Sequence, residues 1–156
     1  MGRKEKDENP DAFEAWAAKM PFSEFIVQYK LDGASLELQY ESGRFVRAVT
    51  RGDGRIGDDI TSNARKMRGV VAELSGESGP SGKRPFSGGV RGEVIMTRAV
   101  LRDFFSDKAN CRNAANGLMK RKDGTGSEHL EVICYDAAPG IPGSPFTGFS
   151  PFDDEY

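Results

Sequence analysis

The chain has 156 residues, of which 37% are hydrophobic and 29% are charged, and these proportions are typical of one globular domain with its own core. Its formal net charge of -2 excludes DNA binding through overall positive charge, so any contact with nucleic acid needs a local basic patch. Two cysteines and one histidine are too few for a disulfide framework or a zinc site.

The first twenty residues predict a charged arm followed by an amphipathic helix. Residues 1–8 are mixed charges without an apolar run, so we expect a disordered arm, no signal peptide and a cytoplasmic protein. Asn9 and Pro10 suit a helix start. Apolar residues then recur at helical spacing: Phe13, Trp16, Ala17 and Met20. This stripe favours packing on a sheet, with stacking on a nucleotide base as the alternative. Pro21 ends the element.

A hairpin around one lysine is the most informative part of the chain. Residues 22–29 predict a strand that leads into Lys30. Residues 34–40 alternate apolar and polar side chains, residues 41–43 supply a turn, and residues 45–50 predict the returning strand. Arg51 follows the far end of the hairpin. The loop after it contains Gly52, Asp53, Gly54 and Gly57, and such glycines let the backbone approach a ligand closely. A cation, a carboxylate and a glycine loop around one hairpin indicate a phosphate-handling site.

The rest of the chain alternates helices and strands. Residues 59–67 predict a helix, with Thr61, Ser62 and Asn63 as alternative caps. Residues 75–89 are rich in Gly, Ser and Pro and predict a surface loop. A strand is expected at 90–96, a helix capped by Thr97 through residue 105, a helix at 113–119 and a last strand at 130–136. From Pro139 onward the composition predicts an irregular tail.

Two basic stretches have two open interpretations. One segment contains five basic residues, Arg51, Arg55, Arg65, Lys66 and Arg68, and residues 120–122 are all basic. A charge run is usually a solvated surface. Because the whole chain is acidic and this segment is basic, contact with DNA phosphates is the alternative.

Four motifs in sequence resemble the adenylation (nucleotidyltransferase) domain of bacterial NAD-dependent DNA ligases. Lys30-Leu31-Asp32-Gly33 matches the nucleophile motif of that family, and Thr50-Arg51-Gly52-Asp53-Gly54 with the residues to Asn63 matches a longer signature. Residues 90–94, which include Glu93, match a motif with an essential glutamate. Asn110-Cys111-Arg112-Asn113 matches the arginine-bearing helix start. The resemblance covers roughly residues 20 to 138. It implies an α+β fold with an antiparallel sheet, of the DNA ligase and capping enzyme type.

The resemblance also implies roles for seven residues. Lys30 is expected to accept AMP from NAD, since a lysine amine is a competent nitrogen nucleophile once it has lost its proton. Arg51 and Arg112 are expected to neutralise phosphate charge, which a guanidinium does bidentately. Asp32 is either catalytic or shapes the turn after the nucleophile. The remaining expected contacts are to the nucleotide: Gln28 to adenine, Glu93 to the ribose hydroxyls, and Gly33 as a further binding residue.

Cofactor and partner expectations follow from the same resemblance. The AMP moiety of NAD is the expected ligand. Magnesium is expected to accompany the phosphates, although no carboxylate cluster marks a dedicated metal site. The expected partners are nicked double-stranded DNA and further ligase domains, with no membrane contact. Such an enzyme serves DNA replication and repair by sealing a 5′-phosphate to a 3′-hydroxyl.

The chain departs from the pattern of the family it resembles at three positions. Gln28 stands where glutamate is usual, Cys111 where proline is usual, and Lys120 where arginine is usual. Two downstream lysine motifs of the family and its upstream nicotinamide-binding domain do not occur in these residues, so we expect no nick sealing and no strong preference between NAD and ATP. Two alternative functions remain: a non-catalytic nucleotide- or DNA-binding remnant, and an ATP-dependent ligase-like enzyme. We expect an arm and helix at 1–20, the nucleotidyltransferase domain at 21–138 and a tail at 139–156.

Overall fold

The computed structural model describes residues 10–52, 56–75, 78–79, 82–83 and 85–140. The predicted arm at 1–8, the Asn9 cap, the middle of the glycine loop at Asp53 and Gly54, and the tail from residue 141 lie outside these ranges. The chain divides into two compact units, one containing Met1–Lys30 and the other Leu31–Phe152.

The first unit contains the predicted amphipathic helix. Helix α1 spans Pro10–Ala17, so it ends three residues before Met20. Phe13, Trp16 and Phe25 form an aromatic cluster, with ring centroids 5.6 to 6.1 Å apart. The apolar stripe therefore packs against the segment that follows it. Whether it also lies on a sheet stays a prediction.

The strand predicted at residues 22–29 is wrong. Residues 22–30 belong to no helix or strand, and each of them is exposed. The aromatic and β-branched side chains of this segment favour a pleated surface only when a partner strand supplies one. No such pairing occurs among the described residues.

The second unit is built on a four-stranded antiparallel sheet. Its strands are β1 (Ala34–Glu41), β2 (Arg44–Thr50), β5 (Gly88–Ile95) and β6 (Glu131–Pro139), in the order β2-β1-β5-β6. The β1–β2 hairpin was predicted and is confirmed. Its turn places Ser42 at φ 49° and Gly43 at φ 80°, the positive values that a two-residue hairpin turn needs. Together with the helices, the sheet confirms the α+β fold class.

Of the three helices predicted for the second unit, two are confirmed. Helix α3 (Arg98–Phe104) is capped by Thr97 as predicted, since the Thr97 side chain accepts a hydrogen bond from the Val100 N–H at 3.3 Å. Helix α4 (Cys111–Met119) begins two residues earlier than predicted, because the Asn110 side chain caps it by accepting from the Asn113 N–H at 2.8 Å.

The third helix prediction, at residues 59–67, is largely wrong. Helix α2 spans only Thr61–Ala64, and no side chain caps its start. Thr61 has other bonds: its Oγ1 donates to Asp59 at 2.6 Å and accepts from the Ala48 N–H at 3.0 Å. These bonds tie the turn to β2, and the hydrogen bond from Thr61 holds the pKa of Asp59 below its ordinary value.

Two smaller elements complete the unit. Strands β3 (Ser78–Gly79) and β4 (Gly82–Lys83) pair within the segment predicted to be loop. A short 3-10 helix, η1, spans Ser127–His129 before β6.

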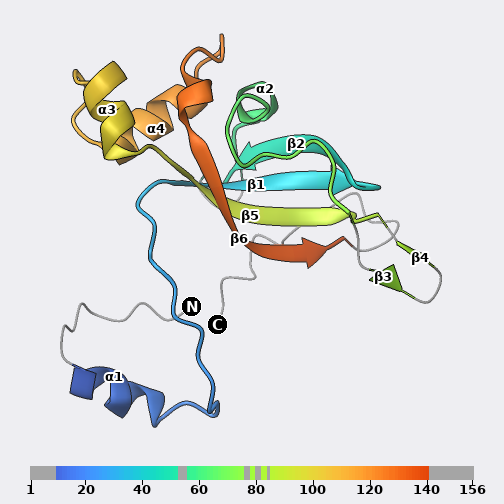
Figure 1. Ribbon diagram of the computed structural model, residues 1–156, viewed down its shortest axis with the longest axis vertical. Coiled ribbons are helices and arrows are strands. Elements are labelled where there is room, and N and C mark those ends of the chain that lie inside the picture. Colours follow the sequence, from blue (N-terminus) through green and yellow to red (C-terminus); the bar gives the residue numbers. More distant parts are fainter. Residues whose placement is uncertain (1–9, 53–55, 76–77, 80–81, 84, 141–156) are drawn as a thin grey trace. The chain divides into compact units, whose positions relative to one another are not determined.

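The core lies on one face of the sheet. Helices α2 and α4 cover this face (Figure 1). Alternate residues of the strands are buried against them, and the core includes Leu36, Leu38, Tyr40, Phe45, Ala48, Val94, Val132, Ala64, Ala115, Leu118 and Met119. The strand residues between these positions, including Ser35, Glu37 and Glu93, therefore point to the opposite face. That face carries the candidate site.

Candidate active site

The carboxylate of Glu93 is fixed from two sides. Strand β5 pairs with β1 so that Glu93 lies opposite Ser35. The Ser35 hydroxyl donates to Glu93 Oε2 at 2.8 Å, and the Gly33 N–H donates to Glu93 Oε1 at 3.1 Å. Each carboxylate oxygen keeps a lone pair for another donor. A carboxylate held in this way is suited to accept hydrogen bonds from a pair of ligand hydroxyls.

Gly33 is required by packing at this point. A Cβ there would lie 2.1 Å from the Val94 carbonyl oxygen and 3.0 Å from Glu93 Cγ. Only glycine lets the start of β1 approach β5 closely enough for its N–H to reach Glu93. The glycine of the nucleophile motif thus allows the close approach of β1 to β5 that lets its N–H bond to Glu93.

Tyr135 lies beside Glu93, and the sequence interpretation missed it. The pairing of β5 with β6 shifts register between Arg91 and Gly92, which leaves Tyr135 in a bulge between Cys134 and Asp136. Burial and the nearby charge of Glu93 raise the pKa of the Tyr135 phenol, while a hydrogen bond with Ser35 opposes that rise. A bulge re-aims a side chain and leaves no local sequence pattern.

Arg51 and Arg91 place positive charge near the Tyr135 phenol. The Arg51 N–H donates to the Ser35 carbonyl at 3.3 Å, so Arg51 directly continues the hairpin beside β1. Both guanidinium groups lower the pKa of Tyr135 electrostatically, with Arg91 the larger influence. We call Ser35, Arg51, Arg91, Glu93 and Tyr135 the sheet-face cluster. It combines an oriented carboxylate with two cations.

Arg112 and Asp32 form an ion pair at 3.3 Å. The pair connects the start of α4 with the residue just before Gly33. Both side chains are exposed, Arg112 by 64% and Asp32 by 79%, and such a pair contributes at most about 1 kcal/mol to stability. The guanidinium therefore remains accessible to a ligand.

Gln28 and Lys30 belong to the first unit, and both side chains are exposed. The structure brings together five of the seven predicted site residues within the second unit. Gly33 bonds to Glu93, Asp32 pairs with Arg112, and Arg51 lies next to β1. Their predicted roles toward a nucleotide stay predictions.

The described part of the glycine loop closes tightly after Arg51. A Cβ on Gly52, which has a φ of +57°, would lie 1.8 Å from the Ile56 carbonyl oxygen. A Cβ on Gly57 would lie 1.9 Å from the Thr50 carbonyl oxygen. The Asp58 N–H donates to Thr50 Oγ1 at 2.9 Å. The glycines of the signature thus return the chain onto the end of β2.

The basic side chains after this loop, Arg65, Lys66 and Arg68, are exposed, and each of them also makes a contact with another part of the fold. The Arg65 guanidinium lies 4.9 Å from the centroid of the Phe45 ring. Lys66 Nζ donates to the Gly124 carbonyl at 3.2 Å, and Arg68 pairs with Glu131 at 3.2 Å. Neither earlier interpretation, a solvated surface or a DNA contact, included these structural contacts.

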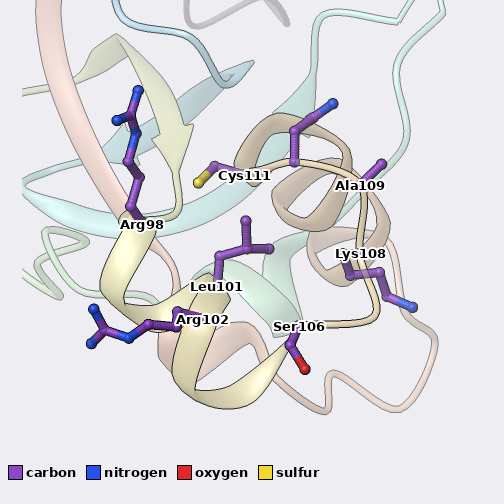
Figure 2. Close-up of a pocket in the computed structure, with 8 residues that line it drawn as sticks. Arg98, Leu101, Arg102, Ser106, Lys108, Ala109 and Cys111 are labelled. Atoms are coloured by element: carbon purple, nitrogen blue, oxygen red, sulfur yellow. The ribbon is translucent and has the colours of Figure 1, made fainter.

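A shallow cavity of about 450 Å³ lies between α3 and the start of α4. Leu101 and Cys111 contribute to its lining, and Figure 2 shows the charged ends of Arg98, Arg102 and Lys108 pointing away from them. Arg102 is paired with Asp103, and Lys108 with Asp107, each at 2.6 Å. The cavity therefore does not concentrate positive charge on a ligand.

Two further observations concern metal sites and membrane-spanning helices. Within the described ranges, no group of three or more histidine, cysteine or carboxylate side chains could hold a metal ion. No described helix is long and apolar enough to cross a membrane.

Comparison with known proteins agrees with the motifs. The model of the family "NAD-dependent DNA ligase adenylation domain" matches residues 9–141. The chain is 62% identical to a DNA ligase of Treponema denticola and 56% identical to one of Treponema pallidum, in each case over 99% of this chain. It is 38% identical to a DNA ligase of Sorangium cellulosum over 74% of its length. The chain spans 24% and 19% of the two Treponema proteins. It belongs to the NAD-dependent DNA ligase adenylation domain family.

Proposed function

We propose that this chain carries out the adenylation step of a DNA ligase, in which Lys30 becomes covalently linked to AMP taken from NAD. The observation that carries the proposal is the oriented carboxylate of Glu93. Its two oxygens are held by Ser35 and Gly33, and its free lone pairs suit the vicinal hydroxyls of a ribose. The same glycine follows Lys30 by three residues, so the nucleophile motif supplies one of the two hydrogen bonds that orient the Glu93 carboxylate.

The reaction requires attack by the neutral amine of Lys30 on the α-phosphorus of NAD. A nitrogen–phosphorus bond forms, the bridging oxygen–phosphorus bond breaks, and nicotinamide mononucleotide leaves with the bonding electron pair. The amine loses its proton to solvent or base. Arg112 and Arg51 balance the negative charge that develops on the phosphate oxygens in the transition state. Electrostatic stabilisation of this kind is usually the largest single contribution to the rate of such a reaction.

The later steps of the proposal concern the whole ligase. AMP passes from Lys30 to a 5′-phosphate at a nick in double-stranded DNA, and other ligase domains assist. In this proposal magnesium accompanies the phosphates of the nucleotide. The proposal also includes roles in DNA replication and repair and a cytoplasmic location. Arg65, Lys66 and Arg68 already contact Phe45, Gly124 and Glu131. They would have to bind DNA phosphates while they keep these contacts, or exchange the contacts for the phosphates.

The test is the intact mass of the chain after incubation with NAD and magnesium. A mass increase of one AMP group, with stoichiometric release of nicotinamide mononucleotide, is expected. An equal increase with ATP and none with NAD would favour the ATP-dependent alternative. No adduct with either donor, despite binding of AMP, would favour a non-catalytic remnant.

Replacing Arg112 with alanine separates its chemical role from its structural one. We expect the adduct to form roughly a hundredfold to a thousandfold more slowly, because one preorganised cation is lost from the phosphate site. The free energy of unfolding should change by less than about 1 kcal/mol, since the pair with Asp32 is exposed. Quenched time courses measure the rate of adduct formation, and urea unfolding measures the free energy of unfolding.

Arg102→Ala is the matched control for that substitution. Arg102 is also an exposed arginine paired with an aspartate, but it lies on α3 and outside the proposed site. An equal loss of adduct in both variants would contradict a specific role for Arg112.

A further inference from the structure

Ser35 lies between Glu93 and Tyr135 on the face of the sheet that carries the site. Its hydroxyl has one hydrogen, which goes to Glu93 Oε2 at 2.8 Å. The Ser35 side chain also interacts with the Tyr135 phenol and lowers its pKa, as a contact that favours the phenolate does. The three side chains come from β1, β5 and β6.

The sheet fixes the positions of these side chains. Ser35 and Glu93 are direct partners in the β1–β5 pairing, and Tyr135 stands in the bulge of β6. Ser35 is half-buried, as is Glu93. A hydrogen bond in a partly desolvated site is stronger than one in water, so the bond from Ser35 restrains the Glu93 carboxylate more firmly than an exposed bond would.

We propose that Ser35 is a positioning residue for nucleotide binding, which holds Glu93 in the rotamer that accepts the ribose hydroxyls. This proposal rests on the proposed function and deepens it. Gly33 restrains one carboxylate oxygen through its backbone, and Ser35 restrains the other through its side chain. Without Ser35 the carboxylate keeps one restraint and can rotate about it. The ligand class is a nucleotide with free 2′- and 3′-hydroxyls.

The experiment compares two ligands on the full chain by NMR titration. AMP carries both ribose hydroxyls, and 2′,3′-dideoxy-AMP carries neither. Wild-type protein should bind AMP more tightly. In Ser35→Ala the affinity for AMP should fall about threefold to tenfold, the range expected for one hydrogen bond, while the affinity for dideoxy-AMP stays the same. Ser35→Thr, which keeps the hydroxyl on a strand-favouring residue, should restore the preference.

A second readout follows the Tyr135 phenol by its NMR shift as pH rises. Because the bond with Ser35 opposes the upward shift of this pKa, Ser35→Ala should move the Tyr135 pKa further up. Ser106→Ala, in the loop between α3 and α4, is the control and should change neither quantity.

The outcomes separate the two proposals. Wild-type protein that binds AMP and dideoxy-AMP equally, or binds neither, overturns both the ribose role of Glu93 and the role of Ser35. A wild-type preference for AMP that survives in Ser35→Ala overturns the role of Ser35 alone. Equal loss of affinity for both ligands in Ser35→Ala would indicate a general structural defect and would also overturn it.

Discussion

Replacing Lys30 with alanine is expected to abolish the covalent AMP adduct completely. Alanine offers no nucleophile, so no phosphorus–nitrogen bond can form. Lys30→Arg should fail equally, because a guanidinium is not deprotonated in proteins and has no electron pair for the attack. Intact mass after incubation with NAD and magnesium gives the yield, and peptide mapping of the wild-type adduct should locate AMP on Lys30.

The controls for this prediction use binding and a second lysine. Non-covalent binding of AMP should persist in both Lys30 variants, since the second unit retains Glu93 with its two restraints. Lys19→Ala removes another exposed lysine of the same unit and should leave the adduct intact. An adduct that maps to a different lysine would refute the assignment of the nucleophile.

The hairpin around the site could be predicted because its signals are local. Alternating apolar and polar side chains in residues 34–40 predict a strand and the face of it that is buried. The Ser-Gly pair that follows predicts the turn at which the chain reverses direction. The strand predicted at 22–29 had the right composition and failed, because pairing depends on a partner that composition does not specify. The helix predicted at 59–67 failed for a related reason: Thr61 bonds to Asp59 and Ala48 instead of capping.

The site could be predicted only as far as its motifs reach. Glu93, Gly33, Asp32 and Arg112 were found through resemblance to a family, and the structure adds which of them touch. Ser35 and Tyr135 were missed. Their meeting depends on the β1–β5 register and on a bulge in β6, and neither is encoded in a short window of sequence.

Gly33→Ala should disrupt the fold and the site together. The new Cβ would lie 2.1 Å from the Val94 carbonyl oxygen, so the start of β1 must move away from β5. We expect a loss of about 1 to 3 kcal/mol in the free energy of unfolding, as for other overpacked positions. The same movement withdraws the Gly33 N–H from Glu93, so the preference for AMP over dideoxy-AMP should also disappear.

Gly117→Ala is the matched control for this substitution, and its predicted effect has the opposite sign. Gly117 is exposed on α4, and a Cβ there would meet nothing within 4 Å. Alanine in a helix interior is more stable than glycine by about 0.5 to 1 kcal/mol, because less backbone entropy is lost on folding. Urea unfolding of both variants should therefore shift the midpoint down for Gly33→Ala and up for Gly117→Ala. If Gly33→Ala left stability unchanged, the close approach of β1 to β5 would be wrong, and with it the geometry that orients Glu93.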